Sequence, residues 1–137
     1  MKYKMFTDGG SRGNPGRAAI GVVIYDKNNK VKKEISRYIG IATNNVAEYT
    51  ALVFGVTALK ELRCTEVEMY LDSELIVKQL KNIYRVKHPA MISLYKKVIA
   101  GLKNIDWSVE HVRREKNKEA DTLVNKALDK EALDKEG

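Results

Sequence analysis

Residues 3–10 have the sequence Tyr3-Lys4-Met5-Phe6-Thr7-Asp8-Gly9-Gly10, an apolar-alternating run that ends in an acid and two glycines. Alternation with a period of two predicts a β-strand, which we expect to span residues 2–8. The glycines and the Ser-Arg-Gly-Asn-Pro-Gly sequence after them are typical of a turn. Asp8 would then end a strand, and open α/β sheets bind ligands at the carboxyl ends of their strands.

The elements that follow this first strand predict a mixed sheet. Two strands joined by a Lys-Asn-Asn-Lys hairpin turn come first, and a helix that is apolar nearly all round, and therefore buried, comes next. The expected elements after residue 8 are strands at 18–26 and 31–39, a helix at about 43–62, a strand at 65–71, helices at 73–83 and 89–102, a strand at 105–112, and a helix from about 117. This β-β-β-α-β-α-α-β-α order predicts an α/β fold, with a five-stranded mixed sheet and helices on both faces.

The composition is that of an ordinary globular protein, and we expect one domain over residues 1–137 with a frayed tail from about 130. The chain is 44% hydrophobic and 31% charged. No apolar run approaches the ~20 residues of a membrane span, and we see no secretory leader, so we expect no membrane association. Cys64 is the only cysteine. A single thiol, expected in or near the core, is typical of the reducing cytoplasm, and a monomer is the default expectation.

The net charge of +7 is unevenly distributed. Residues 78–118 carry eleven Lys or Arg and only three acids. A basic segment of this kind favours a polyanionic partner bound through phosphate contacts. A solvated, lysine-rich surface is the alternative interpretation.

Four acids stand in unusual settings. Glu48 is the only charged residue between Arg37 and Lys60, inside the apolar helix. An acid in that place must be paired, exposed at the helix end or bound to a cation. Asp72 closes the run Val-Glu-Met-Tyr-Leu-Asp, and Asp121 heads the apolar stripe of the last helix.

Each acid also has an ordinary interpretation when taken alone. Asp8 suits a turn, Asp72 suits a helix cap, and Glu48 and Asp121 suit first-turn positions favoured by the helix dipole. If the fold gathers all four, they form an oxygen-only set of ligands for Mg²⁺ or Mn²⁺. Zinc is disfavoured, because the cysteine and the two histidines of the chain have no ligand spacing.

The sequence resembles ribonuclease H, type 1, over almost the whole chain. The first strand with its glycine-rich loop, a Thr-Asn-Asn-x-x-Glu helix start, an Asp-Ser strand end and an Asn-x-x-x-Asp closing helix occur in the family's order. The residues that carry these four motifs are 6–16, 43–48, 70–74 and 117–121. Any one motif would be weak, whereas four in order are specific. The resemblance is to compact, archaeal-like members that lack a basic handle.

The resemblance implies a metal-dependent endoribonuclease that hydrolyses the RNA strand of RNA/DNA hybrids and leaves 5′-phosphate and 3′-hydroxyl ends. It implies two Mg²⁺ ions, with Mn²⁺ as the alternative, about 4 Å apart. Asp8 would bridge the ions, with Glu48 and Asp72 on one and Asp121 on the other. Two alternatives stay open: a nuclease that also accepts double-stranded RNA, and a hybrid-binding module without catalysis, which the retention of all four acids disfavours.

Substrate contacts also follow from the resemblance. Asn14, Asn44 and Asn45 resemble the family's minor-groove residues, which can sense the RNA 2′-hydroxyl. Thr43 resembles its phosphate-pocket residue. A turn for Asn14 and a helix cap at Thr43 or Asn44 are compatible with these roles.

The chain departs from many bacterial relatives just before the last helix. Residues 112–117 are short and contain no histidine, and His111 falls on the predicted strand, so it is not the family's catalytic histidine. We hypothesise that Arg113 or Arg114 engages a substrate or product phosphate instead, against the alternative of ordinary surface arginines. Without a handle, hybrid binding would depend on basic residues of the middle segment: Lys78, Lys81, Arg85, Lys87, Lys96 and Lys97.

Overall fold

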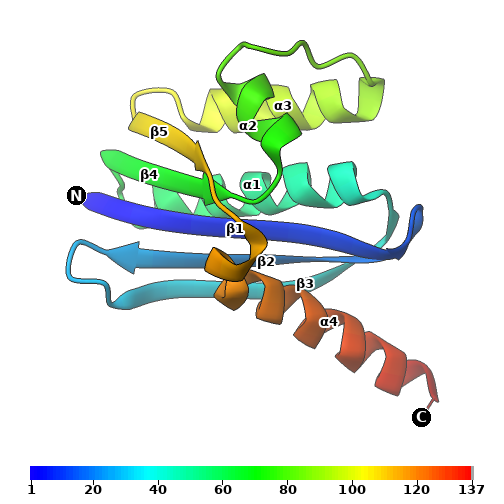
Figure 1. Ribbon diagram of the computed structural model, residues 1–137. Helices are drawn as coiled ribbons and strands as arrows, with labels where there is room; N and C mark the ends of the chain where they lie inside the picture. The colour runs from blue at the N-terminus through cyan, green and yellow to red at the C-terminus, as the bar shows by residue number, and fades with distance from the viewer. Residues whose placement is uncertain (137) are drawn as a thin grey trace.

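The computed structural model describes residues 1–136 and contains a twisted five-stranded sheet (Figure 1). The strands are β1 (Lys2–Gly13), β2 (Gly16–Asp26), β3 (Val31–Ala42), β4 (Glu66–Leu71) and β5 (Asp106–His111). Their order in the sheet is β3-β2-β1-β4-β5. β1 and β3 pair with β2 antiparallel, while β4 pairs with β1 and β5 in parallel, so the predicted mixed sheet is confirmed.

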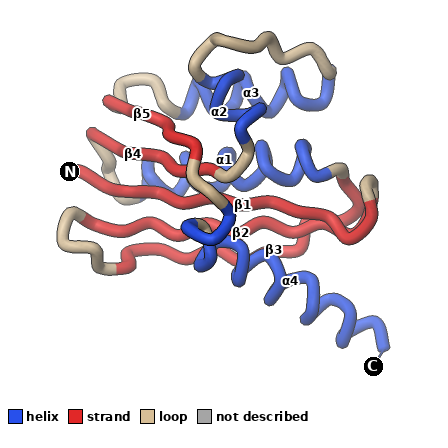
Figure 2. The backbone as a smooth tube through the Cα atoms, viewed as in Figure 1, coloured by secondary structure: helices blue, strands red, loops and turns tan. Residues whose placement is uncertain are grey.

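Helices cover both faces of the sheet, as expected. They are α1 (Asn44–Glu61), α2 (Glu74–Leu80), α3 (Pro89–Gly101) and α4 (Lys118–Glu136), with a short 3₁₀ turn at Arg114–Lys116. α1 packs directly on β1 and β2, α3 packs on α1, and α4 crosses β1, β2 and β3 on the opposite face (Figure 1). Figure 2 shows the connection from β5 passing beside the end of β4 into α4.

The sheet has a separate apolar core on each face. The larger one joins residues such as Met5, Ile20 and Val22 to Leu52 of α1. The smaller one joins Ala19 to α4, whose buried residues there are Val124, Ala127 and Leu128. The stripe expected below Asp121 is therefore the side of α4 that meets the sheet.

β1 is longer than the predicted strand 2–8. The glycine-rich segment continues as strand, because Gly9 to Gly13 pair with β2. Only Asn14 and Pro15, joined by a cis peptide bond, are left for the turn. Inter-strand pairing has overridden the local turn preference of these residues. The parallel pairing with β4 ends at Thr7 and Leu71, so Asp8 lies where β1 loses that neighbour rather than at a strand end.

Other boundaries also differ from expectation: β2 begins at Gly16 rather than at 18, and β3 ends at Ala42 rather than at 39. α2 ends at Leu80, short of the predicted 83, and Asn82 takes a left-handed φ of 62°, which a helix cannot contain. α4 continues to Glu136, fraying from about 130 stays a prediction, and Gly137 lies outside the described residues. In the described part of the chain no helix is both long and apolar enough to span a bilayer.

Candidate active site

The fold brings the four predicted acids to one edge of the sheet, each from a different element. Asp8 on β1 and Asp72 just after β4 are neighbours, because Thr7 and Leu71 before them are paired. Glu48 lies in the second turn of α1 and Asp121 in the first turn of α4. The pKa of Asp8 is raised to about 8, first by burial and then by the charges of Asp72, Glu48 and Asp121. All three partners are therefore electrostatic neighbours of Asp8.

Two glycines let the helices approach β1 at the level of Asp8. A Cβ on Gly9 would lie 2.3 Å from the carbonyl carbon and oxygen of Ala47 and 2.5 Å from the Glu48 nitrogen. Gly21 pairs with Asp8, and a Cβ there would lie 2.1 Å from the carbonyl oxygen of Ala120, the residue before Asp121. Glycine at these positions allows the α1 and α4 backbones to lie directly on the sheet, one on each face. This packing carries Glu48 and Asp121 toward Asp8.

Glu48 is also buried close to another acid. Its pKa is raised to about 7, mainly by burial and then by the charge of Asp72. The neighbouring Ser73 hydroxyl and the Arg114 guanidinium act in the other direction and favour the ionised form. Ser73 also caps α2, because its Oγ accepts a hydrogen bond from the Ile76 N–H at 3.3 Å. Arg114 is thus a cation near this cluster of acids.

The acids fit a divalent cation in chemistry and in charge. Asp72 Oδ2 is buried without a hydrogen-bond partner among the described residues. A buried carboxylate oxygen of this kind is unfavourable unless something positive faces it. Within residues 1–136, no three His, Cys, Asp or Glu side chains already converge as a ready ion site. Like charges repel, so carboxylates without a cation are expected to turn apart, while Asp8 stays within electrostatic range of the other three acids. An oxygen-only set of this kind suits Mg²⁺ or Mn²⁺.

The predicted substrate-contact residues also lie together. Asn14, Thr43, Asn44 and Asn45 line one hollow of about 420 Å³. Asn14 Oδ1 accepts from the Asn44 N–H at 3.1 Å, and Asn44 Oδ1 accepts from the N–H and hydroxyl of Ser11 at 2.8 and 3.0 Å. Thr43 Oγ1 caps α1 by accepting from the Val46 N–H at 3.2 Å. These side chains hold the loop in shape, and within residues 1–136 the Nδ2 groups of Asn14 and Asn44 remain free to donate.

Two residues that were not predicted from the sequence, His88 and Met91, also line this hollow. His88 is the cap of α3, where its Nδ1 accepts from the Ala90 N–H at 3.3 Å. The signal was present in the sequence, since a residue just before a proline often begins a helix. The segment before α3 therefore contributes to the same hollow as the start of α1.

The connection between β5 and α4 carries Arg113 and Arg114, the two arginines proposed to contact phosphate. Arg113 precedes and Arg114 begins the short 3₁₀ turn, both are exposed, and the charge of Arg114 acts on Glu48. His111, at the end of β5, lies near Glu74 instead. Glu74 in turn forms an ion pair of 2.7 Å with Lys78. His111 thus faces a different acid from the four gathered ones.

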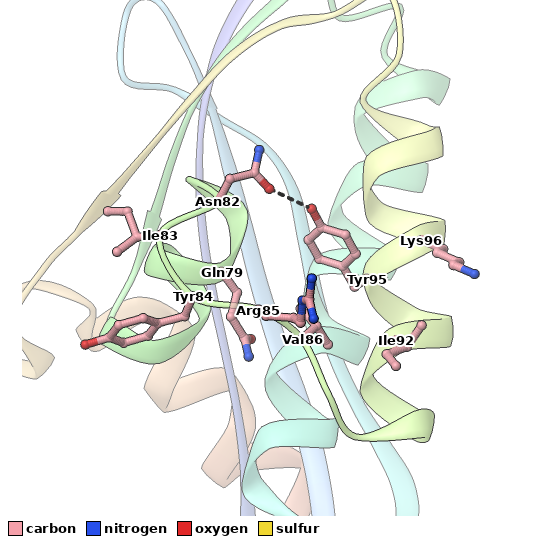
Figure 3. A pocket seen from close by; sticks show the side chains of 9 residues that line it. All are labelled: Gln79, Asn82, Ile83, Tyr84, Arg85, Val86, Ile92, Tyr95 and Lys96. Carbon is pink, nitrogen blue, oxygen red and sulfur yellow. Dashed lines mark hydrogen bonds between the residues drawn. The ribbon is translucent and has the colours of Figure 1, made fainter.

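The basic residues of the middle segment differ in whether they form ion pairs with acids. Lys78 is paired with Glu74, and Lys81 lies 3.8 Å from Glu110. Arg85 and Lys96 line a second hollow of about 450 Å³ between the α2–α3 connection and α3 (Figure 3). No acid lines this hollow, so it cannot hold a metal ion through carboxylates. It adds cationic and aromatic surface beside α3.

Comparisons with known proteins agree on one family. The model of the family described as "Reverse transcriptase-like" matches residues 6–127. A bifunctional protein of Mycobacterium tuberculosis is 40% identical over 133 residues, which are 94% of this chain but 36% of that protein. The chain therefore spans about a third of the length of this relative.

Solved structures extend the likeness to the whole fold. The N-terminal RNase H domain of the mycobacterial protein has a TM-score of 0.90 at 40% identity, covering 93% of this chain and 98% of that one. RNase H1 of the halophilic archaeon Halobacterium salinarum has a TM-score of 0.91 at 37% identity, with 95% and 99% covered. LC11-RNase H1, solved in complex with an RNA/DNA hybrid, has a TM-score of 0.90 at 43% identity, again with 95% and 99% covered.

Proposed function

Because this chain belongs to the type 1 ribonuclease H family, we propose that it is an endonuclease that hydrolyses the RNA strand of RNA/DNA hybrids, leaving 5′-phosphate and 3′-hydroxyl ends. The observation that carries the proposal is the meeting of four acids from four elements beside β1, where burial first, and then the charges of the other three acids, raises the pKa of Asp8 to about 8. A set of uncompensated carboxylates is unfavourable for a protein that only binds nucleic acid, since it repels phosphate. That cost is understandable if the acids serve to bind cations.

Asp8, Glu48, Asp72 and Asp121 would hold two divalent ions, Mg²⁺ or Mn²⁺. Such ions, when bound, make water a stronger nucleophile and stabilise charge on phosphate oxygens. The carboxylates themselves would keep the cations at the sheet edge, and the buried, unpartnered Asp72 Oδ2 supports this role. Asp8 interacts electrostatically with all three other acids, so it is the candidate for the ligand that both ions would share.

The residues that line the hollow at the start of α1, the helix that carries Glu48, suit contacts with a nucleic-acid duplex. Asn14, Asn44 and Asn45 would face a minor groove, where amide donors can contact the RNA 2′-hydroxyl, and Thr43 would face a backbone phosphate. Arg113 and Arg114 would contact phosphate on the side of Glu48. The relative solved with an RNA/DNA hybrid, at 43% identity, supports a hybrid as the preferred substrate.

The decisive experiment compares cleavage of a labelled RNA/DNA hybrid, double-stranded RNA and double-stranded DNA, each with Mg²⁺ or Mn²⁺. We expect cleavage of the RNA strand of the hybrid, dependent on the metal and absent in Asp8→Asn. Cleavage of double-stranded RNA at a comparable rate would show a broader duplex specificity. Tight hybrid binding without cleavage would instead identify a binding module.

We further propose a monomer that works in the cytoplasm. The location rests on a single thiol, Cys64, which is buried and has its pKa raised by that burial. Sedimentation of the purified chain and fractionation of cells that express it test the two statements.

A further inference from the structure

Asn117 makes an unusual contact between α4 and β1. Its side chain is fully buried, and its Nδ2 donates to the carbonyl oxygen of Thr7 at 2.9 Å, across 110 positions of sequence. Thr7 precedes Asp8 and is the last residue of β1 that pairs with β4. The contact therefore reaches the backbone of β1 one residue before Asp8.

The other end of the same residue begins α4. The Asn117 carbonyl oxygen accepts a hydrogen bond from the Asp121 N–H at 3.1 Å, which is the first intrahelical bond. Asparagine at such a position usually caps the helix with its side-chain oxygen. Here Oδ1 is buried and makes no hydrogen bond in the described residues, so the side chain does not cap α4. A simple role as a helix cap does not account for this geometry.

We propose that Asn117 is a positioning residue that sets the separation of Asp8 and Asp121. Its backbone holds the first turn that carries Asp121, and its side chain ties that turn to the strand that carries Asp8. The close approach of the Ala120 carbonyl to Gly21, the residue paired with Asp8, keeps the same turn flat on the sheet. The inference rests on the proposed function, because the separation matters only if the two acids share cations.

The variant Asn117→Ser tests the idea without removing the helix start. Serine begins helices well but is too short to reach the Thr7 carbonyl from this position. We expect Mn²⁺ alone, titrated and followed by the loss of its free paramagnetic resonance signal, to bind about tenfold or more weakly, as is usual when a residue that orients metal ligands is lost. The KM for hybrid should stay near that of the parent. Asn125→Ala is the matched control. The Asn125 Nδ2 donates to the backbone carbonyl oxygen of Asp121 at 3.1 Å, but Asn125 is exposed.

A double-mutant cycle separates positioning from a merely structural role. If Asn117 acts through Asp121, adding Asn117→Ser to Asp121→Asn should weaken Mn²⁺ binding no further. Parent-like Mn²⁺ binding in Asn117→Ser, or an effect that adds fully to that of Asp121→Asn, would overturn the proposal. A lowered Tm with unchanged Mn²⁺ binding would also overturn it. Failure of the proposed function would appear elsewhere, as undiminished cleavage in Asp121→Asn itself.

Discussion

Two adjacent glycines offer a sharp test of how the fold places Glu48. A Cβ added at Gly9 would meet the Ala47 carbonyl at 2.3 Å, whereas one added at Gly10 would meet only the Val124 side chain, at 3.7 Å. The second distance is an ordinary contact and the first is not. The same glycine-to-alanine change at neighbouring positions should therefore have very different effects.

The size of the effect follows from the displacement. Real Cβ contacts are essentially never shorter than 3.0 Å, so the start of α1 must withdraw from 2.3 Å to at least that distance, a shift of about 0.7 Å. A misplacement of ~1 Å in a catalytic group can reduce turnover by about 10²-fold. We expect Gly9→Ala to reduce kcat for hybrid cleavage by roughly 10- to 100-fold. Overpacking should also cost about 1–3 kcal/mol, which lowers the Tm by roughly 3 to 12 °C.

Cleavage of a labelled hybrid, measured well below the Tm of each variant across a Mg²⁺ titration, provides the assay. Gly10→Ala should keep parent activity and a Tm equal to or slightly above that of the parent, because alanine restricts the unfolded chain. Parent-like turnover in a folded Gly9→Ala protein would refute the reasoning, since Glu48 would then not depend on this close approach. Equal losses in both variants would point to the strand rather than to α1.

Three further predictions concern the acids, the arginines and the buried polar pair. Asp8 keeps its proton up to a pH of about 8 when folded but ionises near 3.8 when free, so the folded state binds more protons between these values. The Tm of the metal-free protein should therefore fall as pH rises from about 4 to 8. Calorimetry of Asp8→Asn should show a smaller fall of Tm over this pH range, and the same variant should not cleave the hybrid. Arg113→Ala and Arg114→Ala should weaken hybrid affinity or turnover, and the phosphate role is wrong if kinetics show both variants intact. Tyr49→Phe leaves the buried Gln79 oxygen without its hydrogen bond, so urea unfolding should show a loss of about 1–3 kcal/mol, and an unchanged midpoint would contradict this.

Most of the architecture was predictable from local patterns. Period-two alternation and the apolar helix around Glu48 predicted the element order, because burial on one face leaves a regular trace in sequence. The boundaries were harder. Gly9 to Gly13 have the composition of a turn but form a strand, since pairing with β2 provides hydrogen bonds that the local sequence does not reveal.

The candidate site was also predictable only in part from the sequence. The sequence alone identified four acids that were out of place and grouped them by resemblance, because chemistry and order along the chain are local properties. Only the tertiary structure decided that Gly9 on β1 and Gly21 on β2 admit two helix backbones on opposite faces of the sheet, and that Asn117 reaches Thr7. These contacts join residues up to 110 positions apart. They arise from the packing of helices on a sheet, and no pattern within a single element encodes that packing.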